Sequence, residues 1–301
     1  MEKQKIKKYS VQLKNGVVPY AYQFPVILLL TLLMLVPIVM VIQYSLFDNV
    51  IMNRNPVFSG IANYIAVLRD ETFIAALGNT FYFTVMSVFF HLVIGMLFAM
   101  LLNSKAVLPW LRSLFRVFYI LPWVFTATII AIIWRLLLNP NGVVNYILEV
   151  LRILRGNVEW FASTRTALHA VTFVNIWAGY PFYMVSLLAG LQGIPEDLYE
   201  AATIDGANDV RKFLSITVPQ LAPIIISISL LDFIWTMQVF ALVWMTTGGG
   251  PIHATEVLGT YTYKLAFTRY QFSLASASAV IVLVISMAVA FFYVRNQKIR
   301  D

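Results

Sequence analysis

Six long apolar stretches constrain the fold of this chain more than any other feature of its sequence. They cover residues 25–47, 80–102, 115–138, 167–191, 221–245 and 274–294. A helix needs about 20 mostly apolar residues to cross a bilayer, and only 12% of the 301 residues are charged, about half the share found in soluble domains. We therefore predict an all-α polytopic membrane protein with six transmembrane helices. Pro37, Pro122 and Pro181 lie inside these stretches, where we expect them to kink or interrupt the helices, as membrane bundles tolerate.

The distribution of basic residues predicts the orientation in the membrane. An even number of spans places both termini on one side. If that side is the cytoplasm, the inner segments carry thirteen Lys and Arg residues and the outer segments carry seven, as the positive-inside rule favours. We thus expect a basic cytoplasmic tail over residues 1–24, one six-helix domain over 25–294 and a short cytoplasmic tail over 295–301.

Several kinds of chemistry lack their residues in this sequence. The chain has no cysteine and three histidines, His91, His169 and His253, that lie far apart without ligand spacing, so we expect no metal site. No G-x-x-x-x-G-K-[ST] segment is present, so we expect no nucleotide bound through a phosphate-cradling loop and no cofactor. The net charge of +7 is explained by inner loops of a membrane protein, without a nucleic-acid partner. His91 is interpreted as a hydrogen-bonded packing residue, because its own span carries no acid.

The polar loop over residues 194–223 is patterned like a helix–turn–helix elbow. Pro195 followed by Glu196 and Asp197 is typical of a helix start, and a short helix is predicted from Pro195 to about Ile204. Gly206 follows Asp205 and can adopt a positive φ, and a second helix is predicted over 208–217, ending before Pro219. Small residues at the apex suit insertion into a cleft of another protein. A compact loop that only joins two spans explains the same pattern.

A few polar residues interrupt the apolar spans. Asp232 lies inside the fifth stretch with Thr236 one turn later on the same face, and an ionisable group in a membrane costs about 2.5–3.5 kcal/mol on insertion scales. Asn175 and Gly179 share a face of the fourth stretch, and Trp123 follows Pro122 in the third. These residues either face a wet path or serve helix packing: Asp232 as an interhelical hydrogen bond, Gly179 as a small contact residue and Trp123 as a packing aromatic.

The elbow resembles the EAA loop in the permease subunits of bacterial ABC importers. The matching residues are Glu200-Ala201-Ala202, Asp205-Gly206-Ala207, Phe213, Ile216, Pro219 and Pro223. Further matching segments are Asn63-Tyr64, 76–80, Leu121-Pro122-Trp123, 175–181, 247–251 and 263–267. This set is similar to the carbohydrate-type permeases, in particular the larger permease subunit of maltose transporters, but without that subunit's extra N-terminal helix pair and large outer domain.

The resemblance implies a type I importer fold and a set of partners. These are a second homologous permease, two cytosolic ATPase subunits, an extracytoplasmic binding protein and a sugar or oligosaccharide, all at a bacterial plasma membrane. It implies that the chain is a translocation subunit and not itself an enzyme. The implied ATPase-coupling residues are Glu200, Ala201, Ala202, Asp205, Gly206 and Ala207. The implied substrate-binding residues are Trp123, Asn175, Gly179, Asp232 and Thr236.

Two other functions stay open at this point. A secondary transporter would use Asp232 for ion coupling, and it would show paired ionisable groups, broken helices and inverted repeats. A membrane-embedded enzyme would need a Ser/His/Asp set, paired carboxylates or an H-E-x-x-H segment, and none is found in the sequence.

Overall fold

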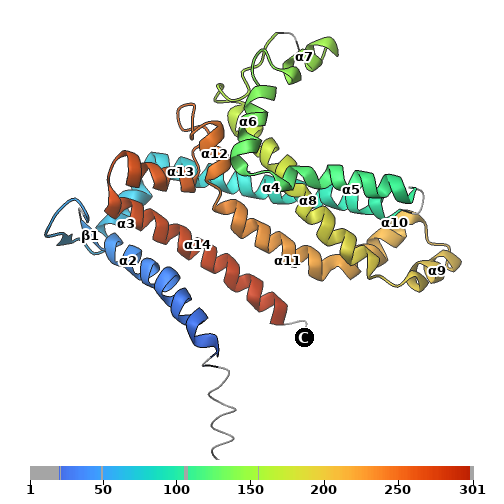
Figure 1. Cartoon of the computed structure of the whole chain (residues 1–301), viewed down its shortest axis with the longest axis horizontal. Coiled ribbons are helices and arrows are strands. Elements are labelled where there is room, and N and C mark those ends of the chain that lie inside the picture. Colours follow the sequence, from blue (N-terminus) through green and yellow to red (C-terminus); the bar gives the residue numbers. More distant parts are fainter. Residues whose placement is uncertain (1–19, 21, 49, 105–107, 155, 299–301) are drawn as a thin grey trace, which may run out of the picture.

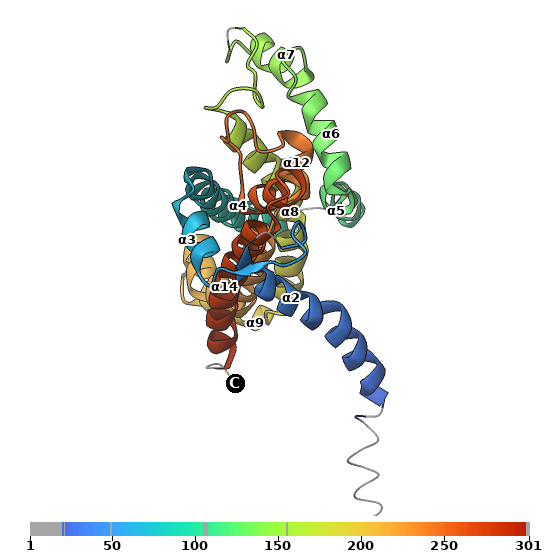
Figure 2. The same cartoon turned by 90° about the vertical axis from the view of Figure 1, so that its left-hand side faces the viewer.

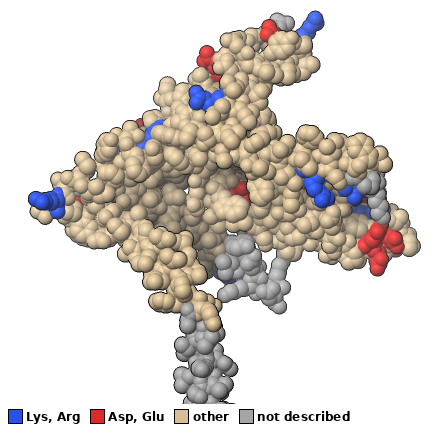
Figure 3. Space-filling view, viewed as in Figure 1, with Lys and Arg blue, Asp and Glu red and all other residues tan. Residues whose placement is uncertain are grey.

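The computed structural model describes residues 20, 22–48, 50–104, 108–154 and 156–298. The described chain is mostly helical, with one small antiparallel hairpin of β1 (Phe47–Asp48) and β2 (Val57–Phe58). The predicted tail over 1–24 falls mostly outside the described residues. On the face shown in Figure 3, charged side chains lie mostly towards the margins, and an acidic group is visible near the centre.

Five single helices are long and apolar enough to cross a membrane: Tyr22–Ser45, Glu71–Asn103, Ala167–Gln192, Asp209–Met237 and Phe272–Phe291. α5 (Pro109–Val124) and α6 (Ala127–Leu137) together are long and apolar enough for a sixth crossing, and they meet at an angle of 101°. The first helix contains a π-helical turn, η1 (Thr31–Leu35), followed by α2 (Val36–Ser45). The last is α14 (Phe272–Lys298), which continues past the predicted end at residue 294.

The centre of the bundle is formed by α4 (Glu71–Asn103), α8 (Ala167–Gln192) and α11 (Val218–Met237). The most extensive helix–helix contact joins α4 to α8, and these two helices lie side by side in Figures 1 and 2. Glycine allows this close approach: a Cβ on Gly95 would overlap Tyr183 and the backbone of Met184. Close backbone contact through small residues is typical of membrane helices. Pro181 lies inside α8, which continues without a break.

Short helices occupy the loops at the outer side that the predicted topology assigns. These are α3 (Ala62–Arg69), α7 (Val143–Val150) and α13 (Leu258–Tyr263), with α13 followed by the π turn η3 (Lys264–Thr268). The first helix diverges from the remaining bundle towards its N-terminal end (Figures 1 and 2). Its apolar residues are exposed throughout the most apolar window of the span, so lipid or another subunit must cover them in a membrane.

Two predicted spans are interrupted in the structure. The third was expected over 115–138 as one stretch, but the helix ends at Val124, two residues after Pro122, and restarts at Ala127, where Thr126 caps the Ile129 amide. The fifth was expected over 221–245, but α11 ends at Met237 and a separate helix, α12 (Ala241–Thr246), follows. The predicted interruption of the third span at Pro122 is confirmed, whereas the prediction of one unbroken helix was wrong for the fifth span.

The elbow has the predicted turn but a different second helix. α9 (Glu196–Ile204) is followed by a turn at Gly206, which has a φ of +76°. This conformation allows the Ala207 amide to donate to the Ala202 carbonyl, as in a Schellman cap. α10 (Asp209–Lys212) then continues through the π turn η2 (Phe213–Thr217) into α11. The predicted stop before Pro219 was therefore wrong. A proline is accommodated in the first turn of α11, because the preceding π turn shifts the hydrogen-bond register by one residue.

Candidate functional site: a polar cavity between broken helices

A cavity of about 340 Å³ lies where the two interrupted spans meet the central helices. The break after α5 contributes Trp123, Phe125 and Ala127, and the break after α11 contributes Val239 and Phe240. Non-helical backbone at membrane depth is tolerated only where it is buried in protein or lines a water-filled space. The non-helical backbone of both breaks lines the cavity, which explains why it is tolerated at this depth.

All five residues with a predicted substrate role line this one cavity: Trp123, Asn175, Gly179, Asp232 and Thr236. They come from three different helices, and His91 of α4 joins them. The indole of Trp123 is 54% exposed, and its ring is 6.2 Å from that of Phe182. The cavity therefore combines an open aromatic face with a polar wall, a combination that suits a ligand with both C–H and hydroxyl surface.

Asp232 is the most highly connected residue of the polar wall. Its Oδ1 accepts a hydrogen bond from Thr236 Oγ1 at 3.0 Å, and its Oδ2 accepts one from the Tyr183 hydroxyl at 3.1 Å. The same Oδ2 lies 2.8 Å from His91 Nδ1. Asp232 and Thr236, which were predicted to share a face, are therefore in direct contact. Asp232 also has partners on α4 and α8 that were not predicted.

His91 was not among the predicted site residues. Its interpretation as a hydrogen-bonded packing residue is confirmed, but an acid from another span contacts it. Its side chain is only 2% exposed, and Nε2 lies 3.0 Å from the carbonyl oxygen of Asn175. The acid that contacts it lies 141 residues away on α11. One signal was available in the sequence, because a histidine in one span and an aspartate in another are both unusual at membrane depth.

Gly179 and Asn175 both hold the His91 ring in place. A Cβ on Gly179 would overlap the His91 ring, so the absence of a side chain makes room for that ring. The Asn175 side chain donates from Nδ2 to Ser87 Oγ at 2.9 Å. The backbone carbonyl of Asn175 faces the His91 ring. Both interpretations of Gly179 remain compatible with its position, since it lines the cavity and packs against a neighbouring helix.

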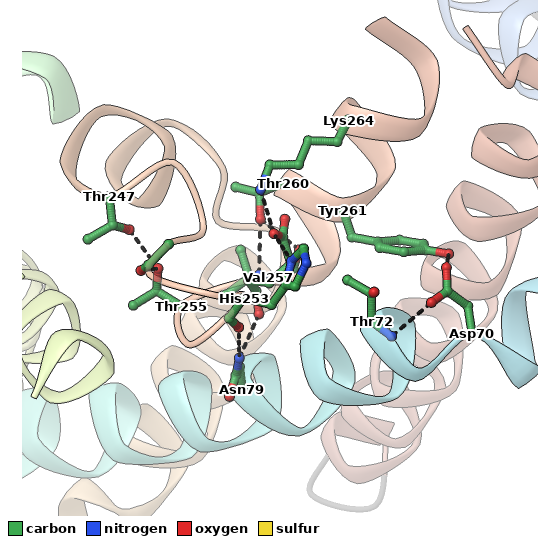
Figure 4. A network of polar contacts seen from close by, with 12 residues as sticks. Asp70, Thr72, Asn79, Thr247, His253, Thr255, Val257, Thr260, Tyr261 and Lys264 are labelled. Carbon is green, nitrogen blue, oxygen red and sulfur yellow. Dashed lines mark hydrogen bonds and ion pairs between the residues drawn. The ribbon is translucent and has the colours of Figure 1, made fainter. Parts of the chain in front are cut away.

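A second polar network holds the loop between α12 and α13 (Figure 4). Glu256 is fully buried and accepts from Lys264 Nζ at 2.5 Å and from His253 Nδ1, which lies 3.1 Å away. Asn79 of α4 donates to the His253 and Glu256 carbonyls. The predicted outer turn over 248–251 contains Gly248 and Gly249, both with positive φ, and a Cβ on Gly249 would overlap Glu256. The segments 76–80 and 247–251 are therefore parts of one joint.

Asp70 extends that joint to the start of α4. It accepts from the Thr72 amide and from the Tyr261 hydroxyl, both at 2.8 Å. Burial would raise the pKa of Asp70, but the hydrogen bonds from Tyr261 and Thr72 and the nearby Arg269 outweigh burial and hold this pKa below its ordinary value. A structural role at the ends of three helices follows from these contacts.

The elbow is exposed, as a docking element would be. Glu200, Ala201, Asp205 and Gly206 are exposed, and Ala202 and Ala207 are half-buried. Apolar side chains protrude beside them, with Ile204 87% exposed. The Tyr199 hydroxyl contacts Thr217 Oγ1 at 2.9 Å and fixes α9 against η2. The predicted coupling residues are thus brought together on one rigid projection.

Five or six apolar crossings and a cavity with one polar wall define a polytopic membrane protein with an internal site. The family described as binding-protein-dependent transport system inner membrane component matches residues 91–299, and the chain belongs to this family. It is an ABC importer permease, a translocation subunit of the inner membrane. The predicted family and fold are confirmed.

Similar proteins cover nearly the whole chain. The probable ABC transporter permease protein YurN of Bacillus subtilis is 32% identical over 283 residues, covering 94% of this chain and 96% of that protein. The trehalose/maltose transport system permease protein MalF of Thermococcus litoralis is 31% identical over 285 residues, covering 93% and 94%.

Two solved structures share the fold. A chain of a bacterial ABC transporter involved in the import of the acidic polysaccharide alginate superposes with a TM-score of 0.84 at 22% identity, over 98% of this chain and all of that chain. A chain of a bacterial alginate ABC transporter in complex with an alginate pentasaccharide-bound periplasmic protein gives a TM-score of 0.81 at 23% identity, over 94% of both chains.

Proposed function

We propose that this chain lines the translocation path of an ATP-driven importer for a sugar or oligosaccharide. In this proposal it pairs with a second permease, receives substrate from an extracytoplasmic binding protein and is moved by two cytosolic ATPase subunits. The observation that carries the proposal is the cavity formed by two broken spans on the same chain as an exposed, rigid elbow. Relatives that transport trehalose and maltose support a sugar as cargo.

In this assignment the cavity holds the sugar and the elbow transmits motion. Trp123 stacks on a C–H face of the sugar, while Asn175, Asp232, Thr236 and the Gly179 region form the polar wall. Glu200, Ala201, Ala202, Asp205, Gly206 and Ala207 enter a cleft on an ATPase. The elbow and the cavity lie at opposite ends of one continuous helix, because α10, η2 and α11 run without a break from Asp209 to Met237.

The alternative drawn from the sequence is a secondary transporter that uses Asp232 for ion coupling, and membership of an ABC importer permease family counts against it. Reconstitution separates the two. The complete complex in proteoliposomes, supplied with binding protein, should accumulate labelled trehalose or maltose only when ATP is enclosed with the ATPases. Accumulation driven by a proton or sodium gradient without ATP would support the carrier. If neither sugar is taken up in the presence of ATP, a panel of longer oligosaccharides should be tested as substrates.

A further inference from the structure

His91 connects the three central helices through a single imidazole ring. The ring extends from α4, its Nε2 lies 3.0 Å from the Asn175 carbonyl of α8, and its Nδ1 lies 2.8 Å from Asp232 Oδ2 of α11. The side chain is 2% exposed. Gly179 lacks the Cβ that would overlap this ring. His91 therefore lies at a position where both ring nitrogens have fixed partners.

The partners determine how many protons the pair must hold. A backbone carbonyl can only accept, so Nε2 carries a hydrogen and donates it. A second proton must lie between Nδ1 and Oδ2, because a bare nitrogen facing a bare carboxylate oxygen would set two lone pairs against each other. The hydroxyls of Tyr183 and Thr236 donate to the carboxyl group from other directions. The pair thus holds one proton more than a neutral imidazole and a free carboxylate.

We propose that His91 and Asp232 share this proton and together carry no net charge in the assembled transporter. His91 is then a positioning residue that neutralises Asp232 and fixes α4, α8 and α11 around the cavity. Among the described residues lining the cavity, none is Lys, Arg or Glu, so the charge of this wall depends on the pair alone.

The consequence for cargo rests on the proposed function. A wall without fixed charge offers hydrogen bonds from neutral groups to a hydroxyl-rich ligand, and it neither repels an anionic sugar nor attracts a cation. An ionised Asp232 on its own would repel an anionic ligand, and the shared proton removes that repulsion. Asp232 is also no free carboxylate for ion coupling, since each of its oxygens already has a protein partner.

The protonation can be read directly without any transport. The complete complex, with ¹⁵N-histidine incorporated, would be compared by solid-state NMR in lipid with the Asp232→Asn complex, so that the difference isolates the ring beside residue 232. We expect a ring whose Nε2 carries hydrogen, either as imidazolium or as the neutral Nε2–H form beside an Asp232 carboxyl that the ¹³C shift of labelled aspartate shows to be protonated. A neutral Nε2–H ring beside an ionised carboxyl would contradict the proposal. A neutral ring with hydrogen on Nδ1 alone would overturn the proposal.

Thermal unfolding of the complex gives an independent test. His91→Leu strands the carboxyl group of Asp232 and should clearly lower Tm, because removing one member of a buried pair leaves an uncompensated charge. Asp232→Asn alone should change Tm little, since the amide can donate to Nδ1 of a neutral ring and the pair stays without net charge. Asp232→Asn added to His91→Leu should recover most of the lost Tm; no recovery would contradict a shared proton. Neither result depends on which substrate is transported, so both stand apart from the proposed function.

Discussion

Gly179 leaves the space that the His91 ring fills, and a single added carbon tests this. Gly179→Ala should displace the ring and cost about 1–3 kcal/mol, the usual cost of overpacking a close-fitted site. The matched control is Gly78→Ala, also within a central helix, where an added Cβ meets no atom within 4 Å. The control should be neutral or stabilising by about 0.5–1 kcal/mol, because alanine is a better helix former than glycine. Tm values of the two assembled complexes provide the comparison.

Trp123 offers the most direct test of substrate contact at residue scale. Asp232 and Asn175 take part in interhelical hydrogen bonds, so replacing either one changes packing as well as binding. The Trp123 ring is 54% exposed, so Trp123→Ala should raise KM for uptake about tenfold, equivalent to about 1.4 kcal/mol, with Tm almost unchanged. Trp123→Phe should keep part of the stacking surface and give an intermediate KM. Unchanged uptake in both variants would move the sugar site to the partner permease.

The limits of sequence reasoning are clearest at this scale. Asp232, Thr236, Asn175, Gly179 and Trp123 were each noticed as polar, small or aromatic residues in apolar spans, and they do share one cavity. His91 was missed because its acid lies in another span, and spacing within one helix carries no information about a contact across 141 residues.

The elements show a similar division between local and tertiary causes. The α5–α6 break has a local signal in Pro122. The break after α11 has none, since the sequence there is Met237-Gln238-Val239-Phe240. At that break the Phe240 ring packs 5.6 Å from Trp244 and 4.8 Å from Tyr263. Such packing stabilises a turned backbone that propensity alone does not predict.

The elbow allows size and backbone strain to be separated at one position. Within the described chain an added Cβ on Gly206 meets no atom within 4 Å, but the φ of +76° disfavours any side chain. Gly206→Asn adds a small residue that tolerates positive φ, so it should keep most of the substrate-stimulated ATP hydrolysis. Gly206→Trp adds a large ring together with more backbone strain than Asn, and if the apex enters an ATPase cleft, stimulation should fall at least tenfold.

The measurement is stimulated ATPase activity in complexes that still co-purify. Equal activity of the Asn and Trp variants would show that nothing closely surrounds the apex, and the elbow would then be only a connector. Loss of activity in both would indicate that the glycine backbone conformation itself is required.

At the scale of the whole molecule, the elbow and the outer joint must face opposite sides of the membrane. The joint around Glu256 and Asp70 ties together the ends of α4, α13 and α14, while α9 and α10 project from the other end of the bundle (Figure 1). The fold supplies two distinct ends but no direction. Only the basic residues of the sequence indicate which end is cytoplasmic.

That direction can be measured because the chain has no cysteine of its own. A cysteine at Asn55, in the exposed segment between β1 and β2, should react with a thiol reagent that cannot cross the inner membrane. The reaction is carried out in cells whose inner membrane is intact and whose outer envelope admits the reagent. A cysteine at Asn208, the exposed N-cap of α10, should react only after the inner membrane is opened. Reaction of both after opening is the control for accessibility. The reverse pattern in intact cells would place the elbow outside, where no cytosolic ATPase can reach it, and the coupling proposal would fail with the topology.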